Sequence, residues 1–291
     1  MNTKKISAIL CADLHLREDQ PLCRTDNYFL TQINKLNFLF ELGTKHNIWT
    51  FFCAGDFFDK AKVSEEFKTN LLECDMPPFY VIPGNHDLPE HNVKNFKKSS
   101  LGVMKAADKV TVKENVPLET FHTANIKNRK IGLIHKLIHK STEDSVVAEG
   151  KTISYPAQKL LKDNPEFDLI LSGDNHKTFV EEYEGRLLVN PGSMMRMTAA
   201  QVDHKPCVFL YYAETNTIEP VYFPIEQGVV SREHIEEKQH KEERDKRMDA
   251  FVKKAGINIE LGIKFEKNLE EYFKLIKIRK AVQQKVWEFV G

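Results

Sequence analysis

The chain has 291 residues, of which 41% are hydrophobic and 29% are charged, and it carries 42 basic and 42 acidic residues. This is the composition of a globular protein with room for one large domain and an appendage, and a formal net charge of zero neither indicates nor excludes a nucleic-acid partner. The five cysteines are scattered and form no CxxC pair, which is typical of a reduced, cytoplasmic protein. No apolar run approaches the roughly 20 residues of a membrane span.

Three short segments in the first third of the chain are predicted to be buried strands, because each is nearly continuous in hydrophobic residues. They cover residues 6–12, 48–54 and 79–82. Amphipathic helices are expected between them, at residues 26–46 with Asp26 as the N-cap, and at residues 64–73. This alternation predicts parallel βαβ units, in which functional groups gather at the carboxyl edge of the sheet.

Polar side chains follow each of these strands. They are Asp13 and His15, then Asp56 and Asp59, then Asn85, His86 and Asp87. Asp13 and His15 are two residues apart, and such residues face the same side of an extended chain. We therefore expect both side chains to reach one ion.

The middle of the chain continues this pattern. A helix is expected at residues 96–106, strands around 110–112 and 120–122, and a short helix at 156–162. Strands at 130–134 and 168–172 end in His135 and in Asp174 and His176, and hairpins cover 179–189 and 207–223. Five strand ends therefore carry oxygen or imidazole groups.

The character of the sequence changes after Gly228. Residues 231–249 are almost purely charged, which indicates a solvated helix or a mobile linker. Apolar residues return at helical spacing over residues 269–289. We expect one domain over residues 1–228, and a charged helical linker with a C-terminal helical cap or partner-docking segment over residues 229–291.

The strand-end groups combine carboxylates, an amide and imidazoles without a thiolate. Such a set suits hard or borderline divalent ions such as Mn²⁺, Fe²⁺, Zn²⁺ or Mg²⁺. There are more ligands than one ion needs, which favours two ions about 3.5–4 Å apart, the arrangement that clamps the attacking and leaving oxygens in phosphoryl transfer. One polar strand end would be unremarkable, but five in this order indicate a site.

The motif order resembles the calcineurin-like metallophosphoesterase superfamily over about residues 6–223. The motifs are Asp-x-His, Gly-Asp-x-x-Asp, Gly-Asn-His-Asp, a lone strand-end histidine and Gly-x-x-His. Within that superfamily, residues 190–193 (Asn-Pro-Gly-Ser) followed by Arg196 are similar to the SbcD-type DNA nucleases, and Arg24-Thr25-Asp26 is similar to their small phage relatives. The resemblance implies an α/β (α+β) fold, a four-layer αββα sandwich with a C-terminal helical appendage.

The resemblance also implies a role for each matching residue. Asp13, His15 and His176 would hold the first metal, Asn85, His135 and Asp174 the second, and Asp56 would bridge both. His86 would stabilise the transition state or protonate the leaving oxygen, with Asp87 orienting its ring. Asp59 would support the site rather than bind an ion. Asn190, Ser193 and Arg196 would lie on the path of the substrate phosphate.

Asp174 departs from the family pattern, which usually has a histidine at this position. A carboxylate still binds a hard ion and shifts the preference toward Mn²⁺ or Mg²⁺, although it leaves a weak second site open. His139 is a rival to His135 for the lone-histidine role. Asp59 and Asp87 have a structural alternative as caps of the following turn, and Asn190 and Ser193 have one as ordinary turn residues.

The resemblance therefore implies a two-metal-dependent DNA nuclease that uses Mn²⁺ and forms the nuclease subunit of an SbcCD-like repair or recombination complex. The expected partners are DNA and an SbcC-like coiled-coil ABC ATPase, and a homodimer stays open. Basic residues near His91 and His135 are compatible with a nucleic-acid groove, although charged stretches are more often solvated faces. Two alternatives remain, which are hydrolysis of phosphoproteins or small phosphoesters and a scaffold that has lost catalysis.

Overall fold

The structure is a computed structural model that describes residues 5–113, 117–143, 147–148, 151–152, 154–254 and 265–290. The chain divides into two compact units, Met1–Ser231 and Arg232–Gly291. The sequence predicts this boundary after residue 228. No helix among the described residues combines the length and the apolar character that crossing a membrane requires.

The first unit contains a six-stranded mixed sheet with the order β15-β14-β1-β2-β3-β4 in the described residues. Its four parallel strands are β1 (Ala8–Cys11), β2 (Phe51–Cys53), β3 (Phe79–Val81) and β4 (Val110–Val112). The hairpin of β14 (Cys207–Tyr212) and β15 (Thr217–Tyr222) adds to β1 in the antiparallel direction. The predicted strands and this hairpin are confirmed, and the strands themselves are shorter than the apolar runs.

A second, five-stranded sheet has the order β12-β13-β11-β6-β5 in the described residues. It consists of β5 (His122–Ile126), β6 (Arg129–His135), β11 (Leu169–Gly173), β12 (Phe179–Tyr183) and β13 (Arg186–Asn190). β6 and β11 run parallel, so their carboxyl ends lie at one edge. The strand expected around 120–122 begins at His122 and continues to Ile126, because it pairs with β6 as a hairpin.

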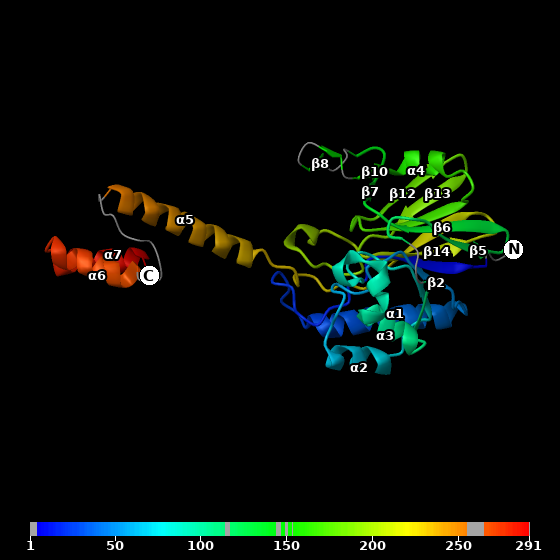
Figure 1. Cartoon of the computed structure of the whole chain (residues 1–291), viewed down its shortest axis with the longest axis horizontal. Helices are drawn as coiled ribbons and strands as arrows, with labels where there is room; N and C mark the ends of the chain where they lie inside the picture. The colour runs from blue at the N-terminus through cyan, green and yellow to red at the C-terminus, as the bar shows by residue number, and fades with distance from the viewer. Residues whose placement is uncertain are drawn as a thin grey trace. The chain divides into compact units, whose positions relative to one another are not determined.

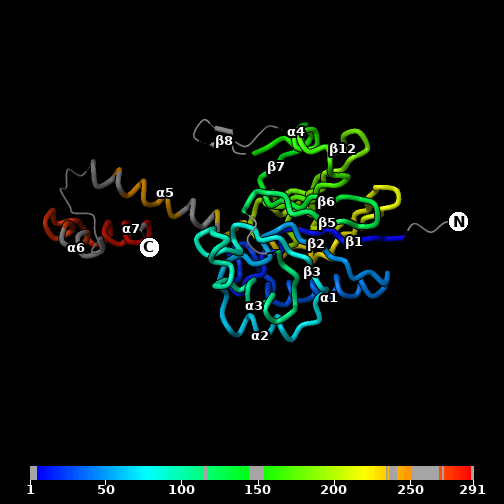
Figure 2. The backbone as a smooth tube through the Cα atoms, turned by 45° about the vertical axis from the view of Figure 1, so that its right-hand side comes forward, coloured from blue at the N-terminus to red at the C-terminus, as the bar shows by residue number. Residues whose placement is uncertain are grey.

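Helices cover both outer faces of the paired sheets (Figure 1). On one side lie α1 (Tyr28–His46), α2 (Glu65–Glu73) and α3 (Ser100–Ala106), and on the other lies α4 (Ala157–Asp163). One apolar core fills the space between the sheets, including Leu10 with Leu133 and Leu171. Two further cores hold the helices, through Leu36 of α1 on one side and Leu161 of α4 on the other. The predicted four-layer arrangement is confirmed, and the tube view shows the same layers (Figure 2).

Two helix starts show how local chemistry sets the elements. Ser64 caps α2, and its side chain accepts a hydrogen bond from Phe67 N. The predicted cap of α1 is wrong by one residue, since Asn27 accepts from Leu30 N. Asp26 instead pairs with Arg24 and accepts from the Thr31 hydroxyl, so its carboxylate is already engaged. The helix expected at 96–106 begins as the 3₁₀ turn η2 (Val93–Lys98), and Ser99 caps α3 after it.

Short elements complete the first unit. The 3₁₀ turn η1 (Pro89–His91) precedes η2, and η3 (Ala199–Gln201) precedes β14. The strand pairs β7 (Ile138–His139) with β10 (Tyr155–Pro156), and β8 (Val147–Ala148) with β9 (Lys151–Thr152), follow β6.

The second unit is helical in its described part. α5 (Glu233–Lys254) contains the charged stretch, and α6 (Phe265–Leu275) and α7 (Lys280–Val290) contain the apolar positions. Phe273 of α6 meets Trp287 of α7 edge to face, with ring centroids 6.1 Å apart. Leu269 and Phe273 are buried, whereas Leu275 and Phe289 are exposed. The expected helical spacing is thus confirmed.

Candidate metal centre

The carboxyl ends of β1, β2, β3, β6 and β11 deliver the predicted site residues to one place. Asp13, His15 and Asp56 adopt left-handed backbone conformations, with φ of 51°, 45° and 47°. Such conformations cost about 1–3 kcal/mol each for residues other than glycine and persist where the surroundings enforce them. The expectation that Asp13 and His15 converge because the chain is extended is therefore wrong in its reason, although the two side chains do converge.

Glycines allow the strand ends to approach each other. A Cβ atom on Gly84 would lie 2.1 Å from Asp56 Oδ1, and one on Gly173 would lie 2.2 Å from Ala54 O. On Gly55, which has a φ of 91°, it would lie 2.3 Å from His135 Nδ1. Each of these glycines immediately precedes a predicted site residue. The glycine in each Gly-Asp motif and in the Gly-Asn-His motif is therefore required by the packing of the site.

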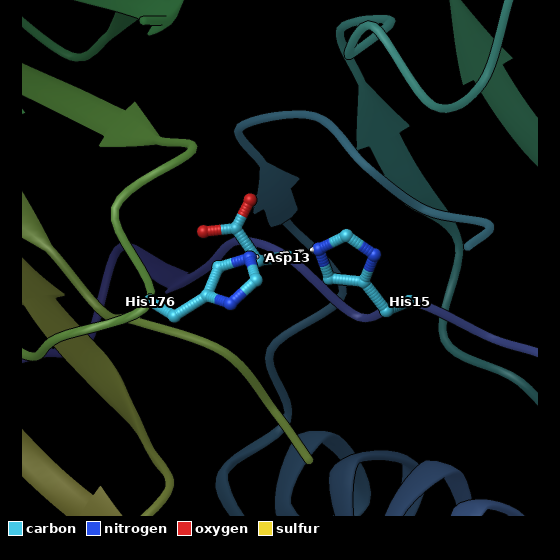
Figure 3. A group of neighbouring side chains, drawn as sticks. All are labelled: Asp13, His15 and His176. Atoms are coloured by element: carbon cyan, nitrogen blue, oxygen red, sulfur yellow. Dashed lines mark hydrogen bonds between the residues drawn. The ribbon is translucent and has the colours of Figure 1, made fainter. Parts of the chain in front are cut away.

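Asp13, His15 and His176 form the first group of candidate ligands (Figure 3). Their ligand atoms lie within 4.8 Å of one another, and the Nε2 atoms of His15 and His176 are 3.0 Å apart. Asp13 and His15 come from the loop after β1, and His176 comes from the loop after β11. Asp13 and His15 are buried and His176 is half-buried, so the group is screened from water.

The second group surrounds Nε2 of His135. Asn85 Oδ1 is 3.0 Å from this nitrogen, Asp56 Oδ2 is 3.2 Å from it, and Asp174 Oδ1 is 3.9 Å from it. His135 Nδ1 lies 2.8 Å from the Ala54 carbonyl, which can only accept, so Nδ1 carries a proton. This second contact orients the ring and directs Nε2 toward the three oxygens, as is common for histidines that bind metals.

The two groups meet at Asp56. The same oxygen, Oδ2, is 3.2 Å from His135 Nε2 and 3.6 Å from His15 Nε2. The other oxygen, Oδ1, accepts a hydrogen bond from His86 N at 3.0 Å. The carboxylate is therefore fixed with one oxygen between the two groups.

The buried carboxylates of Asp13 and Asp56 are balanced by histidines rather than by lysine or arginine. Burial raises the pKa of Asp13 to about 7, against the opposing effect of His135 and His15. Burial also acts to raise the pKa of Asp56, but His135 and His15 outweigh it and lower that pKa to about 2. Among the described residues, no lysine or arginine pairs with Asp13, Asp56 or Asp174. Buried carboxylates without such partners are costly unless a cation is present.

The pKa values of His135 and His176 are shifted in opposite directions. Burial disfavours the charged form of His135, but Asp56 and Asp13 raise its pKa to about 10. Burial and the neighbouring His15 lower the pKa of His176 to about 4. His176 is thus a neutral donor of an electron pair, which is the form that binds metals. The donor set of imidazole, carboxylate and amide oxygen fits divalent ions such as Mn²⁺, Fe²⁺ or Zn²⁺.

His86 and Asp87 do not act on each other. His86 is exposed at the mouth of the site, and its Nδ1 donates to Asp59 O at 2.8 Å. Asp87 is fully buried, and its carboxylate accepts from the backbone N–H groups of Phe57, Phe58 and Gly84. The expectation that Asp87 orients the His86 ring does not agree with these contacts, and neither does the alternative that Asp87 caps the following turn. Its carboxylate instead clamps the loop after β2 to the loop after β3.

Asp59 lies next to the Nδ1 atom of His15, away from the nitrogen that faces the ligand group. Its Oδ1 is 3.4 Å from His15 Nδ1, and its Oδ2 is 3.2 Å from Arg17 Nη1. Asp59 also lies with His15 and His86 in a third group of candidate ligand atoms, again within 4.8 Å of one another. Arg17 belongs to none of the sequence motifs, although its position two residues after His15 is a signal for such a role.

Asn190, Ser193 and Arg196 lie in the interior, where their polar atoms are engaged. Asn190 Nδ2 donates to Asn175 O and Lys177 O, which fixes the loop that carries His176. Ser193 Oγ donates to Met195 O, and Arg196 donates to Val202 O and Glu226 O. The predicted contact with the substrate phosphate does not agree with this arrangement, in which all three residues bind to the protein.

His139 is buried and lies 2.9 Å, through Nδ1, from Ser154 Oγ. It belongs to the pair β7–β10, and His135 is the histidine that reaches the ligand groups. His135, at the end of β6, is therefore the histidine that lies among the candidate ligands, and His139 is not.

A family model for the calcineurin-like phosphoesterase superfamily domain matches residues 7–215. The chain belongs to this superfamily. A search of curated proteins found no match.

Several solved structures of this fold resemble the chain at low sequence identity. An archaeal phosphodiesterase is 16% identical with a TM-score of 0.42, and the alignment covers 74% of this chain and 99% of that one. Vps29 from Entamoeba histolytica, in complex with Zn²⁺, is 14% identical with a TM-score of 0.34 and coverages of 74% and 97%. Vps29 from Cryptosporidium parvum is 18% identical with a TM-score of 0.37 and coverages of 76% and 97%.

Proposed function

We propose that the protein is a two-metal-dependent phosphodiesterase that hydrolyses DNA and prefers Mn²⁺. The observation that carries the two-metal part is the position of Asp56 Oδ2 between His15 of the first group and His135 of the second. Asp13, His15 and His176 would hold one ion, and Asn85, His135 and Asp174 the other. Bound there, divalent ions supply Lewis acidity at the phosphoryl oxygens and a nucleophile at neutral pH.

His86 is the residue with the clearest catalytic position. Its Nδ1–H donates to the Asp59 carbonyl, so Nε2 is the atom left to meet the substrate. Its ring centroid is 5.2 Å from that of His15, which places it beside the first ligand group. A protonated Nε2 would donate to a phosphoryl oxygen as negative charge develops, or transfer its proton to the leaving oxygen.

The DNA substrate is supported by the resemblance to SbcD-type nucleases and by lysines that follow a ligand-bearing loop in the sequence. Lys94, Lys97 and Lys98 of η2 are exposed and follow the segment that carries Asn85 and His86. Cations beside a phosphodiester site neutralise the flanking phosphates of a nucleic acid and release counterions. A small phosphoester has no such flanking phosphates to bind.

We also propose that the helical unit α5–α7 docks an SbcC-like coiled-coil ATPase. Val282 and Phe289, seven residues apart on α7, are 49% and 75% exposed, and Leu275 at the end of α6 is 81% exposed. Apolar side chains presented at helical spacing are the usual means of binding a partner helix in a groove or coiled coil. A pull-down with a coiled-coil fragment of such an ATPase should fail for the double variant Leu275→Ser and Phe289→Ser, and an unchanged yield would argue against this docking.

The nuclease activity can be tested with end-labelled duplex and single-stranded DNA in the presence of Mn²⁺. Asp56→Asn should lower cleavage at least about 10³-fold, because it weakens both ligand groups. His86→Ser should lower cleavage about 10²–10⁴-fold while Mn²⁺ still binds. The matched control is Asp203→Asn, since Asp203 is exposed and outside both groups. Intact DNA with the wild type, together with cleavage of bis(4-nitrophenyl) phosphate, would favour a small phosphoester as substrate.

A further inference from the structure

A cavity of about 360 Å³ opens beside the second ligand group. One wall consists of Asn85, His135 and Asp174. The remaining wall consists of residues with no assigned role, namely His91, Leu118, Glu119 and Lys136. Its volume lies at the lower end of the roughly 300–1,000 Å³ that small-molecule sites occupy. The cavity therefore has room for a single chemical group of a substrate and not for a DNA duplex.

His91 is held in this wall by an unusual backbone. Both Glu90 and His91 have left-handed conformations, with φ of 58° and 51°. His91 Nδ1 is 2.8 Å from Asn85 O, which can only accept, so this nitrogen carries the proton. The hydrogen bond fixes the ring next to the loop that carries Asn85, and Nε2 has no hydrogen bond to the described residues.

Lys136 supplies a cation on the same wall. Its Nζ is 3.4 Å from Glu119 Oε2 and 5.2 Å from the centre of the Tyr155 ring. The Lys136 side chain is 30% exposed and that of Glu119 is 64% exposed. Ion pairs as exposed as this one contribute little to stability, so the ammonium can exchange Glu119 for a phosphate at little cost.

We propose that this cavity binds the phosphate next to the scissile one in a DNA strand, with Lys136 and His91 as its specificity-determining residues. Lys136 provides the charge, His91 provides a fixed polar atom, and Leu118 provides an apolar surface for the sugar. The inference rests on the proposed phosphodiesterase function, because the scissile phosphate is placed at the two ligand groups. It identifies the preferred substrate as one that carries two neighbouring phosphates.

Binding of two nucleotides to the Mn²⁺-loaded full chain tests the proposal without turnover. The probes are thymidine 3′,5′-bisphosphate and thymidine 5′-monophosphate, and calorimetry gives both affinities. The wild type should prefer the bisphosphate at least about tenfold, or about 1.4 kcal/mol. Lys136→Gln should remove this preference and leave the affinity for the monophosphate within about twofold. His91→Gln should reduce the preference, and its Mn²⁺ affinity is measured separately because His91 contacts Asn85.

Lys127→Gln is the matched control. Lys127 also pairs with a glutamate, through Nζ and Glu214 Oε1 at 2.5 Å, but it precedes the amino end of β6, whereas Lys136 follows the carboxyl end. An equal affinity of the wild type for both nucleotides, or a preference that persists in Lys136→Gln, would overturn the subsite. Failure to cleave DNA in the separate nuclease assay would instead overturn the proposed function, whatever the nucleotide preference.

Discussion

Several side chains of the site are held in place by a second contact with the surrounding protein. His135 is oriented by Ala54 O, His86 by Asp59 O, and the loop of His176 by the Asn190 amide. Most of these supports are backbone atoms or buried amides. Such contacts restrict the side chains before any ion binds, which lowers the cost of assembling the site.

At the residue scale, Asp87 is predicted to be essential for stability. Its carboxylate accepts three backbone N–H groups and is fully buried, so Asp87→Asn replaces an acceptor with a donor in front of them. We expect the free energy of unfolding to fall by about 2–4 kcal/mol in urea titrations. The exposed Asp203→Asn should change it by less than about 0.5 kcal/mol. A stable Asp87→Asn protein would refute the clamp.

Lys35 is predicted to make the stability of the first unit depend on pH. Burial, together with Arg24 and Arg196, lowers the pKa of this amine to about 7, while in the unfolded chain the pKa keeps its ordinary value of 10.5. Between these values the unfolded state binds a proton that the folded state does not, so stability rises with pH from about 7 upward, by up to about 1.4 kcal/mol per unit. Below pH 7 both states are protonated, and this contribution stays at its lowest.

The measurement is the unfolding free energy of the metal-free protein at pH 7, 8 and 9. Lys35→Met should flatten the rise relative to the wild type. It also leaves Met194 O without its hydrogen bond from Nζ, which shifts all values equally and does not affect the slope. Parallel slopes for the two proteins would show that Lys35 is charged in the folded state at pH 7–9.

At the scale of elements, the site depends on strand ends that touch. Gly84→Ala would place a Cβ atom 2.1 Å from Asp56 Oδ1 and 2.4 Å from Asp56 N. We expect a loss of at least about 3 kcal/mol in stability or a loss of Mn²⁺ binding, because backbone must shift. Gly185→Ala is the control, since Gly185 has a φ of 70° but nothing lies within 4 Å of the new methyl group, and it should cost only about 1 kcal/mol. Similar effects of the two substitutions would contradict the close-approach explanation.

The elements were largely predictable from the sequence, but their contacts were not. Nearly continuous apolar runs indicated β1, β2, β3, β6 and β11, and the polar residues after them indicated one edge. What the side chains of Asp87 and Asn190 do could not be predicted, because both are polar residues in loops, where an exposed role and a buried one have the same local pattern. The left-handed conformations of Asp13 and His15 also have no local signal, since tertiary contacts enforce them.

At the scale of the whole molecule, bound metal should stabilise the first unit in a pH-dependent way. An ion that binds only the folded state raises its stability, and binding requires deprotonated ligands. Because the pKa of Asp13 is raised to about 7 and that of His135 to about 10, protons compete with the ion more strongly at low pH. The increase in melting temperature caused by Mn²⁺ should therefore be larger at pH 8 than at pH 6. The opposite order would contradict these ligand assignments.

The number of Mn²⁺ ions bound per chain tests the central claim most directly. Equilibrium dialysis of the wild type should reach two ions at saturation, and His176→Ala and His135→Ala should each leave about one, because each variant weakens a different ligand group. Asp56→Asn should weaken both sites. A wild type that saturates at a single ion, or two variants that both lose the same ion, would contradict a two-metal centre joined by Asp56.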